Sequence, residues 1–531
     1  MSTHFATKTG RVAAGGSLFV GGVAGALVLA PQAGAATTYT VTNTADSGAG
    51  SLRQALDDAN NNAGADIIVF DAGASGTITL TTGQLDIFDD VTITGLGAAD
   101  SIISGNNNSR IFYIYNYETS LTVSISGLTM TDGASTNYGG AIANWGNDLT
   151  LSSVVLTGNE AIGAGGAIHS APSISPNTDT NAPLTIIDSE ISDNTAGGTG
   201  GGLNFYRVGN VTITNTVISG NATVRSGGGI YARYAGNVSI DSSTFDQNTA
   251  GAVGGGLYAT YTDSFTMTNS TVSGNQGTNG AGLLLGKNGD VLIANSTVAN
   301  NVGSPNGSGG GALNLWESSG DTSIIFCTIS GNASSISTVR LASDSPYEIE
   351  ITGTIMSDNA TNGGSGTQAV ELLLTEVFES TAAPSELTLS SSLIMGTTDG
   401  DPLIDGGGNV NGVSAQLGAL ADNGGATFTM EPATGSPVID AGPLTWTAFA
   451  GDGSDQRGGL FLRVSNGQSD MGALEVQPDP APPTSSTSST STSSTSSTTT
   501  TLAPNDTTTT LVPEDTTTTV GTDPMVPTFT G

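Results

Sequence analysis

The sequence predicts an all-β chain that folds as a right-handed parallel β-helix of about 27 residues per coil, with an N-terminal capping helix. Asparagines recur at positions 194, 221, 248 and 275, and a fixed spacing of this size is typical of stacked repeats. Each repeat contains a run of alternating apolar and polar residues, such as VTIT from Val211, which indicates a strand with one buried face. The repeats are rich in Val, Ile, Thr, Gly and Asn and poor in Glu and Lys, which argues against helical repeats.

The recurring parts of each repeat predict three short strands per coil. A glycine pair precedes an apolar residue, as in GGLNFY at 201–206 and GGIYAR at 228–233, and predicts a tight bend that opens a strand. The alternating run follows, and a further apolar pair then leads into a polar turn that ends in Asn, where we expect the Asn to be left-handed. Two rows of residues are expected to point inward: Val211, Val238 and Phe265, and Ile213, Ile240 and Met267.

The composition indicates a thin core spread along an axis. The 531 residues include 76 glycines and 36% hydrophobic residues, with 11 basic against 46 acidic residues and a net charge of −35. This charge argues against nucleic acid and against an anionic membrane surface as partners. Cys327 is the single cysteine and lies in the apolar run IIFCTISGN, so we expect a buried structural thiol and no intramolecular disulfide.

Residues 1–35 have the features of an export signal. Lys8 and Arg11 precede an apolar run at 12–30, and Ala33-Gly34-Ala35 provides a small-residue cleavage site. An uncleaved membrane anchor is the alternative interpretation. We therefore expect a secreted or cell-surface protein with no transmembrane segment after signal cleavage.

Residues 36–112 are expected to form the N-terminal cap and the first coils. The segment SLRQALDDAN at 51–60 predicts a helix, in which Ser51 and Gln54 have capping-box spacing. One face of this helix is apolar: Leu52, Ala55, Leu56 and Ala59. The stretch Gly50-Ser51-Leu52-Arg53-Gln54-Ala55 resembles the Cys-Ser-Leu-Arg-Glu-Ala motif of bacterial β-helix surface proteins, although the Cys and the Glu are replaced here. The resemblance implies a structural role.

Residues 113–400 are expected to hold the β-helix repeats. The segments GGAI at 139–142 and 165–168 and TFDQN at 244–248 resemble the repeats of polymorphic outer-membrane proteins. This resemblance implies a surface-exposed β-helix of the pectate-lyase-like class. Such repeats specify shape strongly and activity weakly.

Residues 401–477 are expected to form a module that closes the solenoid. The segments LGALADNGG at 417–425, GSPVIDAG at 435–442, DQRGG at 455–459 and DMGALE at 470–475 resemble the C-terminal choice-of-anchor Q module of bacterial β-helix proteins. The resemblance implies a surface or secreted protein. Its charged residues allow two interpretations, a metal or catalytic cluster and, preferred here, turns with a buried Asp–Arg pair: Asp440, Asp455, Arg457, Asp470 and Glu475.

Residues 478–531, rich in Ser, Thr and Pro, are expected to be a disordered tail.

The sequence leaves catalytic residues unknown and gives no reason to expect a cofactor or a metal. Glycosidases of this fold class group two or three carboxylates, and the predicted coils show no such group. His169 is the one histidine outside the export signal and is expected at a surface position of a coil. A lyase remains possible if acidic residues converge opposite Arg233 and Lys287 and hold a cation.

The glycine-led strands predict one sheet face that carries aromatic and basic residues. Their alignment places seven residues at one buried position: Ile142, Ile168, Leu203, Ile230, Leu257, Leu283 and Leu313. The candidate binding residues then fall on the outward face: Trp145, Tyr206, Arg207, Tyr231, Arg233, Tyr234, Tyr258, Tyr261, Lys287 and Trp316. Coils about 4.8 Å apart match the length of a sugar unit, so this face suits a polysaccharide held by ring stacking and by Arg pairing with carboxylate or sulfate. Stabilisation of an exposed sheet by stacked rings is the alternative.

Two functions remain open from the sequence. The leading hypothesis is a non-catalytic, adhesin-like β-helix protein that binds an extracellular polysaccharide or a cell-surface partner. The alternative is a polysaccharide lyase or glycoside hydrolase that acts on an acidic extracellular polymer. The oligomeric state is not indicated.

Overall fold

The computed structural model describes residues 34–116, 118–172, 181–305, 307, 310–343, 348–361, 370–376, 386–399 and 403–477. The predicted export signal, apart from its last two residues, and the predicted tail lie outside the described residues. The chain separates into two compact units, residues 1–478 and 479–531, and the described residues all belong to the first. Among them, no helix has the length and apolar content needed to cross a membrane.

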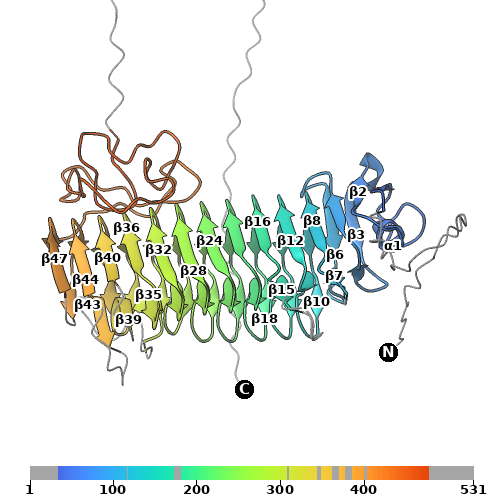
Figure 1. The fold of residues 1–531 in the computed structure, drawn as a ribbon, viewed down its shortest axis with the longest axis horizontal. Coiled ribbons are helices and arrows are strands. Elements are labelled where there is room, and N and C mark those ends of the chain that lie inside the picture. Colours follow the sequence, from blue (N-terminus) through green and yellow to red (C-terminus); the bar gives the residue numbers. More distant parts are fainter. Residues whose placement is uncertain are drawn as a thin grey trace, which may run out of the picture. The chain divides into compact units, whose positions relative to one another are not determined.

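The described chain forms a parallel β-solenoid, which confirms the predicted all-β fold (Figure 1). Its strands build four sheets, and each central coil contributes one strand to each sheet in the order sheet C, sheet A, sheet B and sheet D. The sequence predicted three strands per coil. The additional strand of each coil is only two residues long, as in β22 (Ala222–Thr223), and is too short to give an alternation pattern.

Sheet A has 14 strands and receives the alternating runs. Its strands are β1 (Thr38–Val41), β2 (Asp66–Phe70), β5 (Val91–Thr94), β8 (Thr122–Ser126), β12 (Asp148–Ser152), β16 (Leu184–Ile187), β20 (Val211–Thr214), β24 (Asn237–Asp241), β28 (Ser264–Thr268), β32 (Asp290–Ala294), β36 (Thr322–Ile325), β40 (Glu348–Thr352), β44 (Glu386–Ser390) and β47 (Leu403–Gly407).

Sheet B has 13 strands. They are β3 (Gly76–Thr79), β6 (Ser101–Ser104), β9 (Thr129–Thr131), β13 (Val155–Thr157), β17 (Glu190–Ser192), β21 (Val217–Ser219), β25 (Thr244–Asp246), β29 (Thr271–Ser273), β33 (Thr297–Ala299), β37 (Thr328–Ser330), β41 (Ile355–Ser357), β45 (Leu393–Ile394) and β48 (Val410–Asn411).

Sheet C has 12 strands and receives the glycine-led strands. They are β4 (Leu85–Ile87), β7 (Phe112–Tyr115), β11 (Ile142–Trp145), β15 (Ile168–Ala171), β19 (Leu203–Tyr206), β23 (Ile230–Arg233), β27 (Leu257–Thr260), β31 (Leu283–Gly286), β35 (Gly310–Trp316), β39 (Ser337–Ser343), β43 (Val370–Glu376) and β46 (Thr397–Asp399).

Sheet D has nine short strands. Besides β22 they are β10 (Ala134–Ser135), β14 (Glu160–Ala161), β18 (Thr195–Ala196), β26 (Thr249–Ala250), β30 (Gln276–Gly277), β34 (Val302–Gly303), β38 (Ala333–Ser334) and β42 (Ala360–Thr361).

The predicted inward rows line the core of the solenoid. In sheet A, Ile213 pairs with Ile240 and Ile240 with Met267, and all three side chains are fully buried. Burial of side chains of this size contributes roughly 1.5–3 kcal/mol each. The same row ends at Asp405 of β47, which pairs with Leu389, so a polar residue terminates the apolar stack.

A buried ladder of asparagines joins successive coils. The Asn194 side-chain amide donates to the Oδ1 atom of Asn221 at 2.9 Å, and Asn221 donates in the same way to Asn248 at 3.0 Å. The prediction that these asparagines are left-handed is wrong, because the positive φ belongs to the preceding residue, such as Gly220 or Gln247. Asn is needed here because its amide both donates to and accepts from the neighbouring coils.

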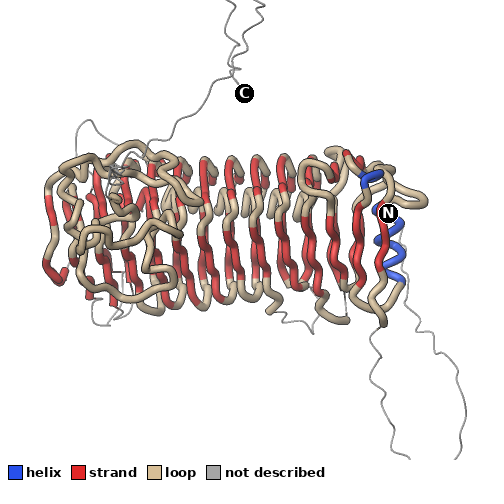
Figure 2. The backbone as a smooth tube through the Cα atoms, turned by 90° about the horizontal axis from the view of Figure 1, so that it is seen from above, coloured by secondary structure: helices blue, strands red, loops and turns tan. Residues whose placement is uncertain are grey.

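The one α-helix in the described ranges, α1 (Leu52–Asn61), covers the N-terminal end of the solenoid (Figure 2). A short 3-10 helix, η1 (Ala72–Ala74), follows β2. The Ser51 side chain accepts from the Gln54 backbone N–H, which confirms the predicted N-cap. The Gln54 side chain donates to Asp58 instead of returning to Ser51, so half of the capping box forms. The predicted apolar face of α1 is buried: Leu52, Ala55, Leu56 and Ala59.

Residues 412–477, the C-terminal segment, lie along the side of the solenoid and not across its last coil as expected (Figure 1). The outward hydroxyl of Thr271 donates to the Phe428 carbonyl at 2.6 Å, and that of Thr297 donates to Gln456 at 2.6 Å. Ile355 packs with other apolar residues of this contact: Leu393, Ala415, Val438 and Met471. The C-terminal segment therefore covers the outer face of sheet B from β29 to β45.

Candidate functional site

The outward face of sheet C carries the candidate binding residues, and the predicted alignment of its strands is confirmed. Ile142 pairs with Ile168, and the same row continues to Leu313. One outward row therefore holds Tyr231 beside Tyr258. Nine of the ten candidates form one group, which we call the aromatic-basic patch: Tyr206, Arg207, Tyr231, Arg233, Tyr234, Tyr258, Tyr261, Lys287 and Trp316.

The turn that follows each sheet C strand aligns a second row of side chains. Arg207, Tyr234, Tyr261 and Lys287 occupy equivalent positions and have φ values of 54°, 58°, 57° and 53°. The left-handed conformation costs a non-glycine residue roughly 1–2 kcal/mol, and Gly146 takes the equivalent position after β11. In the patch, residues with large side chains adopt this left-handed conformation, and their side chains contact those of the neighbouring coils.

The aromatic rings of the patch stack mainly on one another. The Tyr231 and Tyr258 rings are parallel within 2° with centroids 4.8 Å apart, and the Tyr234 and Tyr261 centroids are 4.7 Å apart. Tyr206 meets Tyr234 edge to face at 5.8 Å. Because ring faces are turned toward neighbouring coils, sugar rings cannot stack on each of them in the way the sequence suggested.

Cations alternate with rings along the patch. The Arg207 guanidinium lies 5.4 Å from the Tyr206 centroid, and that of Arg233 lies 4.8 Å from Tyr234 and 5.3 Å from Tyr261. Lys287 continues the series, 5.6 Å from Tyr261 and 5.4 Å from Trp316. Contacts of this kind contribute about 0.5–1 kcal/mol at exposed sites.

The charges of the patch differ in how they are balanced. The Lys287 Nζ atom forms an ion pair with Glu317 at 2.6 Å, and this pairing is the main cause of its raised pKa. Among the described residues, Arg207 and Arg233 form no ion pair with a carboxylate. Burial is the largest single influence on the pKa of Arg233 and acts to lower it, but the hydrogen bond to Tyr231 and the electrostatic interactions with Tyr231, Tyr234 and Tyr258 together raise the pKa. Neither guanidinium group is therefore neutralised by a carboxylate of the described residues.

Trp145, the tenth candidate, belongs to a separate group on the same sheet. Its ring meets His169 at 5.2 Å, and His169 stacks on Tyr138 at 4.5 Å. The expectation that His169 is a surface residue is wrong, because Tyr138 and Trp145 cover it and burial lowers its pKa to about 4. Its Nδ1 atom is 3.0 Å from Asn204 Oδ1. Tyr138 was missed in the sequence because it precedes the glycine pair and lies outside the aligned strand positions.

In the described part of the chain, no cluster of acidic residues able to hold a cation lies opposite Arg233 and Lys287. Opposite Lys287 lies Glu317, which is already paired with that lysine. No group of three or more His, Cys, Asp or Glu residues able to hold a metal ion occurs within the described ranges. Cys327 is fully buried with a pKa raised by burial to about 12, as expected of a structural thiol.

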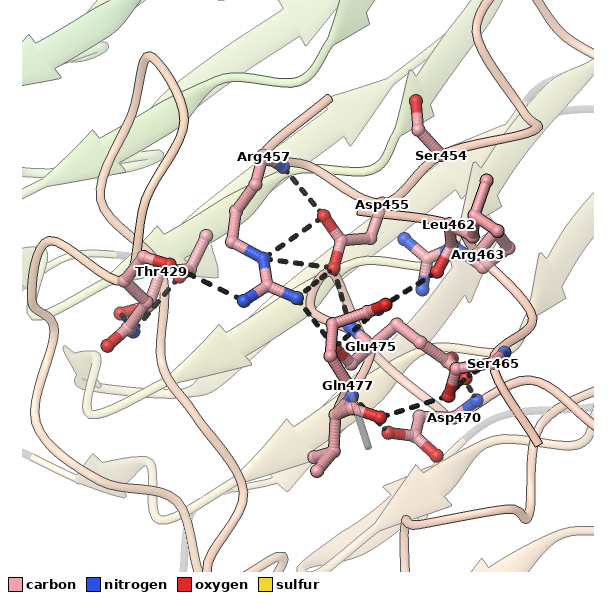
Figure 3. A network of polar contacts seen from close by, with 12 residues as sticks. Thr429, Ser454, Asp455, Arg457, Leu462, Arg463, Ser465, Asp470, Glu475 and Gln477 are labelled. Atoms are coloured by element: carbon pink, nitrogen blue, oxygen red, sulfur yellow. Dashed lines mark hydrogen bonds and ion pairs between the residues drawn. The ribbon is translucent and has the colours of Figure 1, made fainter. Parts of the chain in front are cut away.

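Five charged residues of the C-terminal segment form a buried network (Figure 3): Asp455, Arg457, Arg463, Asp470 and Glu475. Asp440, by contrast, is exposed. The carboxylate of Asp455 is fully buried and accepts from the Arg457 side chain at 2.6 and 3.0 Å. It also accepts from the Glu475 backbone N–H at 2.9 Å. These bonds occupy the carboxylate, which supports the structural interpretation of the motif over a metal or catalytic cluster.

Arg463 attaches the network to the solenoid and was not singled out in the sequence. It is fully buried, donates to the carbonyls of Gly472 and Ala473, and donates to Asn295 Oδ1 at 2.7 Å. Its guanidinium lies 4.3 Å from the Phe326 ring centroid. Burial lowers the pKa of Arg463 to about 10, so it stays charged at neutral pH.

The central coils match a known family. Residues 173–333 match the family model described as the right handed beta helix region. The matched region includes β19, β23, β27 and β31, which carry most of the aromatic-basic patch. No curated protein matches the chain. Over its central coils the chain is thus similar to right-handed β-helix proteins, in agreement with the predicted fold.

Proposed function

We propose that this protein is a non-catalytic β-helix protein of the cell surface or extracellular medium that binds an acidic polysaccharide through the aromatic-basic patch. The observation that carries the proposal is that two arginines at the surface, the exposed Arg207 and the half-buried Arg233, have no carboxylate partner among the described residues of a chain of net charge −35. Strands β7 to β31 of sheet C, and the residue after each, contain no Asp or Glu. A positive strip in an acidic protein selects anionic ligands.

The geometry favours ion pairing over ring stacking as the main contact. The rings of the patch face each other and the guanidinium groups, so the edges of the rings and the phenolic hydroxyls are the parts left for a ligand. The stacked rings hold the arginines in place, which lowers the entropy lost when they bind a carboxylate or sulfate. A linear polymer suits this arrangement because Arg207 and Arg233 lie on adjacent coils, about 4.8 Å apart along the axis.

The proposed location rests on the sequence features. The export signal and the resemblance of residues 401–475 to the choice-of-anchor Q module support a secreted or surface protein. The resemblance of the coils to polymorphic outer-membrane protein repeats supports the same location. A lyase or hydrolase remains the second candidate only through the general association of this fold class with polysaccharides.

The test measures binding of the full chain to polygalacturonate, alginate, chondroitin sulfate and neutral dextran by calorimetry. We expect binding to at least one acidic polymer and none to dextran. The Arg207→Ala/Arg233→Ala variant should bind at least about tenfold more weakly. Arg225→Ala, which removes an exposed arginine outside the patch, is the matched control and should bind like the wild type.

Two outcomes would contradict the proposal. Equal affinity of the double variant and the wild type would assign the patch a purely structural role. Release of reducing ends or of unsaturated sugars from any of these polymers would support the enzymatic alternative.

A further inference from the structure

The buried network of the C-terminal segment has an odd balance of charges. It contains three carboxylates and two guanidinium groups, and each residue except Arg457 is at most 1% exposed: Asp455, Asp470, Glu475, Arg457 and Arg463. The Arg457 side chain is 7% exposed. If all five groups were ionised, one negative charge would be left uncompensated in a buried place, which is costly. Retention of one proton makes the network neutral.

Asp470 and Glu475 are the two carboxyl groups of the network without a cationic hydrogen-bond partner, so this proton is assigned to them. Asp455 is excluded because it is the direct partner of Arg457. Glu475 accepts from the Asp470 backbone N–H at 2.7 Å and from Ser465, and Asp470 accepts from the Asp440 backbone N–H at 2.6 Å. None of these donors carries a full positive charge. Burial raises the pKa of Glu475 to about 7 and also raises that of Asp470, so the two titrate as a coupled pair.

The other charged groups near the pair do not cancel its charge. Arg457 donates to the backbone carbonyl of Glu475, and Asp440 is exposed beside Asp470. From the solenoid, the uncharged Asn295 and Phe326 contact Arg463, and the uncharged Thr328 accepts from the Ala473 backbone N–H. Cys327, which lies near Arg463, is a protonated thiol at neutral pH.

We propose that docking of the C-terminal segment onto sheet B is coupled to the binding of one proton by Asp470 and Glu475, so that the segment opens more readily above neutral pH. The docked pKa of Glu475, about 7, lies above its ordinary value of 4.5. The docked state therefore binds more protons than the open state between these values. Docking is strongest at low pH and weakens as the pH rises toward 7 and above. Opening uncovers the outer face of β29 to β45.

Hydrogen exchange of the full chain between pH 6 and pH 8 tests this coupling. Protection factors, corrected for the intrinsic pH dependence of exchange, should fall by about tenfold in residues 412–477 between these pH values. Peptides from β13 to β25, which the segment does not cover, should keep constant protection. Constant protection in residues 412–477 overturns the proposal.

A substitution at Glu475 tests whether the pH dependence of protection arises from Asp470 and Glu475. Glu475→Gln removes one titrating group, so its segment should lose most of the pH dependence, whereas Glu431→Gln, at an exposed carboxylate of the same segment, should keep it. A Glu475→Gln segment with the full pH dependence contradicts the assignment. If Glu475→Gln prevents docking at every pH, the pH dependence of protection in the wild-type segment alone decides whether docking is coupled to proton binding.

Discussion

Arg233 in the aromatic-basic patch and Arg463 in the C-terminal segment both lie over aromatic rings, but their guanidinium groups meet different surroundings. Arg463 is fully buried and bonded to three fixed oxygen atoms, on Gly472, Ala473 and Asn295. Arg233 is half-buried, hydrogen-bonds phenolic oxygens and has no carboxylate partner among the described residues. Arg463 is thus held entirely by contacts within the fold, whereas Arg233 is held at the surface by rings and keeps no carboxylate partner among the described residues.

The two halves of sheet B show the same contrast for uncharged positions. Val217 in β21 is 43% exposed, whereas Thr271 in β29 and Thr297 in β33 are fully buried at the equivalent outward position. Glu190 occupies this position in β17, and Ile355 occupies it in β41. The exposure of the outward residue, and not its type, thus reports whether the C-terminal segment covers the coil, since Thr244 in the uncovered strand β25 is partly exposed although it is a threonine like Thr271.

The largest loss of stability is expected when a charged side chain is placed in the core, where it would have no partner. Ile240→Asp places a carboxylate in the core row between Ile213 and Met267, and should lower the free energy of unfolding by about 4 kcal/mol. Ser239→Asp, at the next outward position, is the control and should change it by less than about 0.5 kcal/mol. Chemical denaturation measures both. Equal stability of the two variants would mean that the register is wrong.

Removal of one partner from the buried network should cost about 3 kcal/mol. Asp455→Ala removes the carboxylate that neutralises the buried Arg457 guanidinium and accepts from the Glu475 N–H, and leaves Arg457 with only backbone carbonyls as acceptors. Hydrogen exchange should show the loss in residues 412–477, with coils β13 to β25 unaffected. Glu431→Ala, on the surface of the same segment, should have no effect. Loss of protection throughout the solenoid would contradict the view that the segment docks as a separate layer.

The stacked rings of the patch should contribute less to the free energy of unfolding than the buried network does. Tyr231→Ala removes one member of the parallel pair with Tyr258 and should lower the free energy of unfolding by about 1 kcal/mol. Tyr231→Phe keeps the ring and is expected to retain wild-type stability. If both variants have wild-type stability, the rings do not hold the patch together.

The smallest effect on stability is expected at the one neutralised cation of the patch. Glu317→Gln releases Lys287 from its half-exposed ion pair and should change the free energy of unfolding by less than about 0.5 kcal/mol. Affinity for the acidic polymer should rise by roughly two- to threefold, because a third cation becomes available. A fall in affinity would show that Glu317 itself takes part in binding.

The repeat period predicted most of the fold because each coil obeys the same local rules. The alternation of Ile213 and Ile240 with polar residues defined both register and core. The Asn ladder was recognised by spacing, but its conformation was assigned wrongly, since a hydrogen bond between coils leaves no local signal. The position of the C-terminal segment could not be predicted, because its contacts join residues such as Thr297 and Gln456, 159 positions apart in the chain.

The composition of the patch was predictable, and its ring geometry was not. Strand register alone brought Tyr206, Arg233 and Tyr234 to one face. Whether a ring turns its face to solvent or to the next coil depends on side-chain packing between neighbours, which the sequence does not specify. The mutual stacking of Tyr231 and Tyr258 shifts the expected contact with a polymer from ring faces to the arginines.

The salt dependence of polymer binding tests the role of Arg207 and Arg233 most directly. Each ion pair that forms with a polyanion releases counterions, so the logarithm of the binding constant falls with the logarithm of the salt concentration. The slope for the Arg207→Ala/Arg233→Ala variant should be smaller than that of the wild type by up to about 2, and that of Arg225→Ala should be unchanged. The same slope for all three proteins would contradict the account, because it would mean that the arginines of the patch pair only with the protein itself.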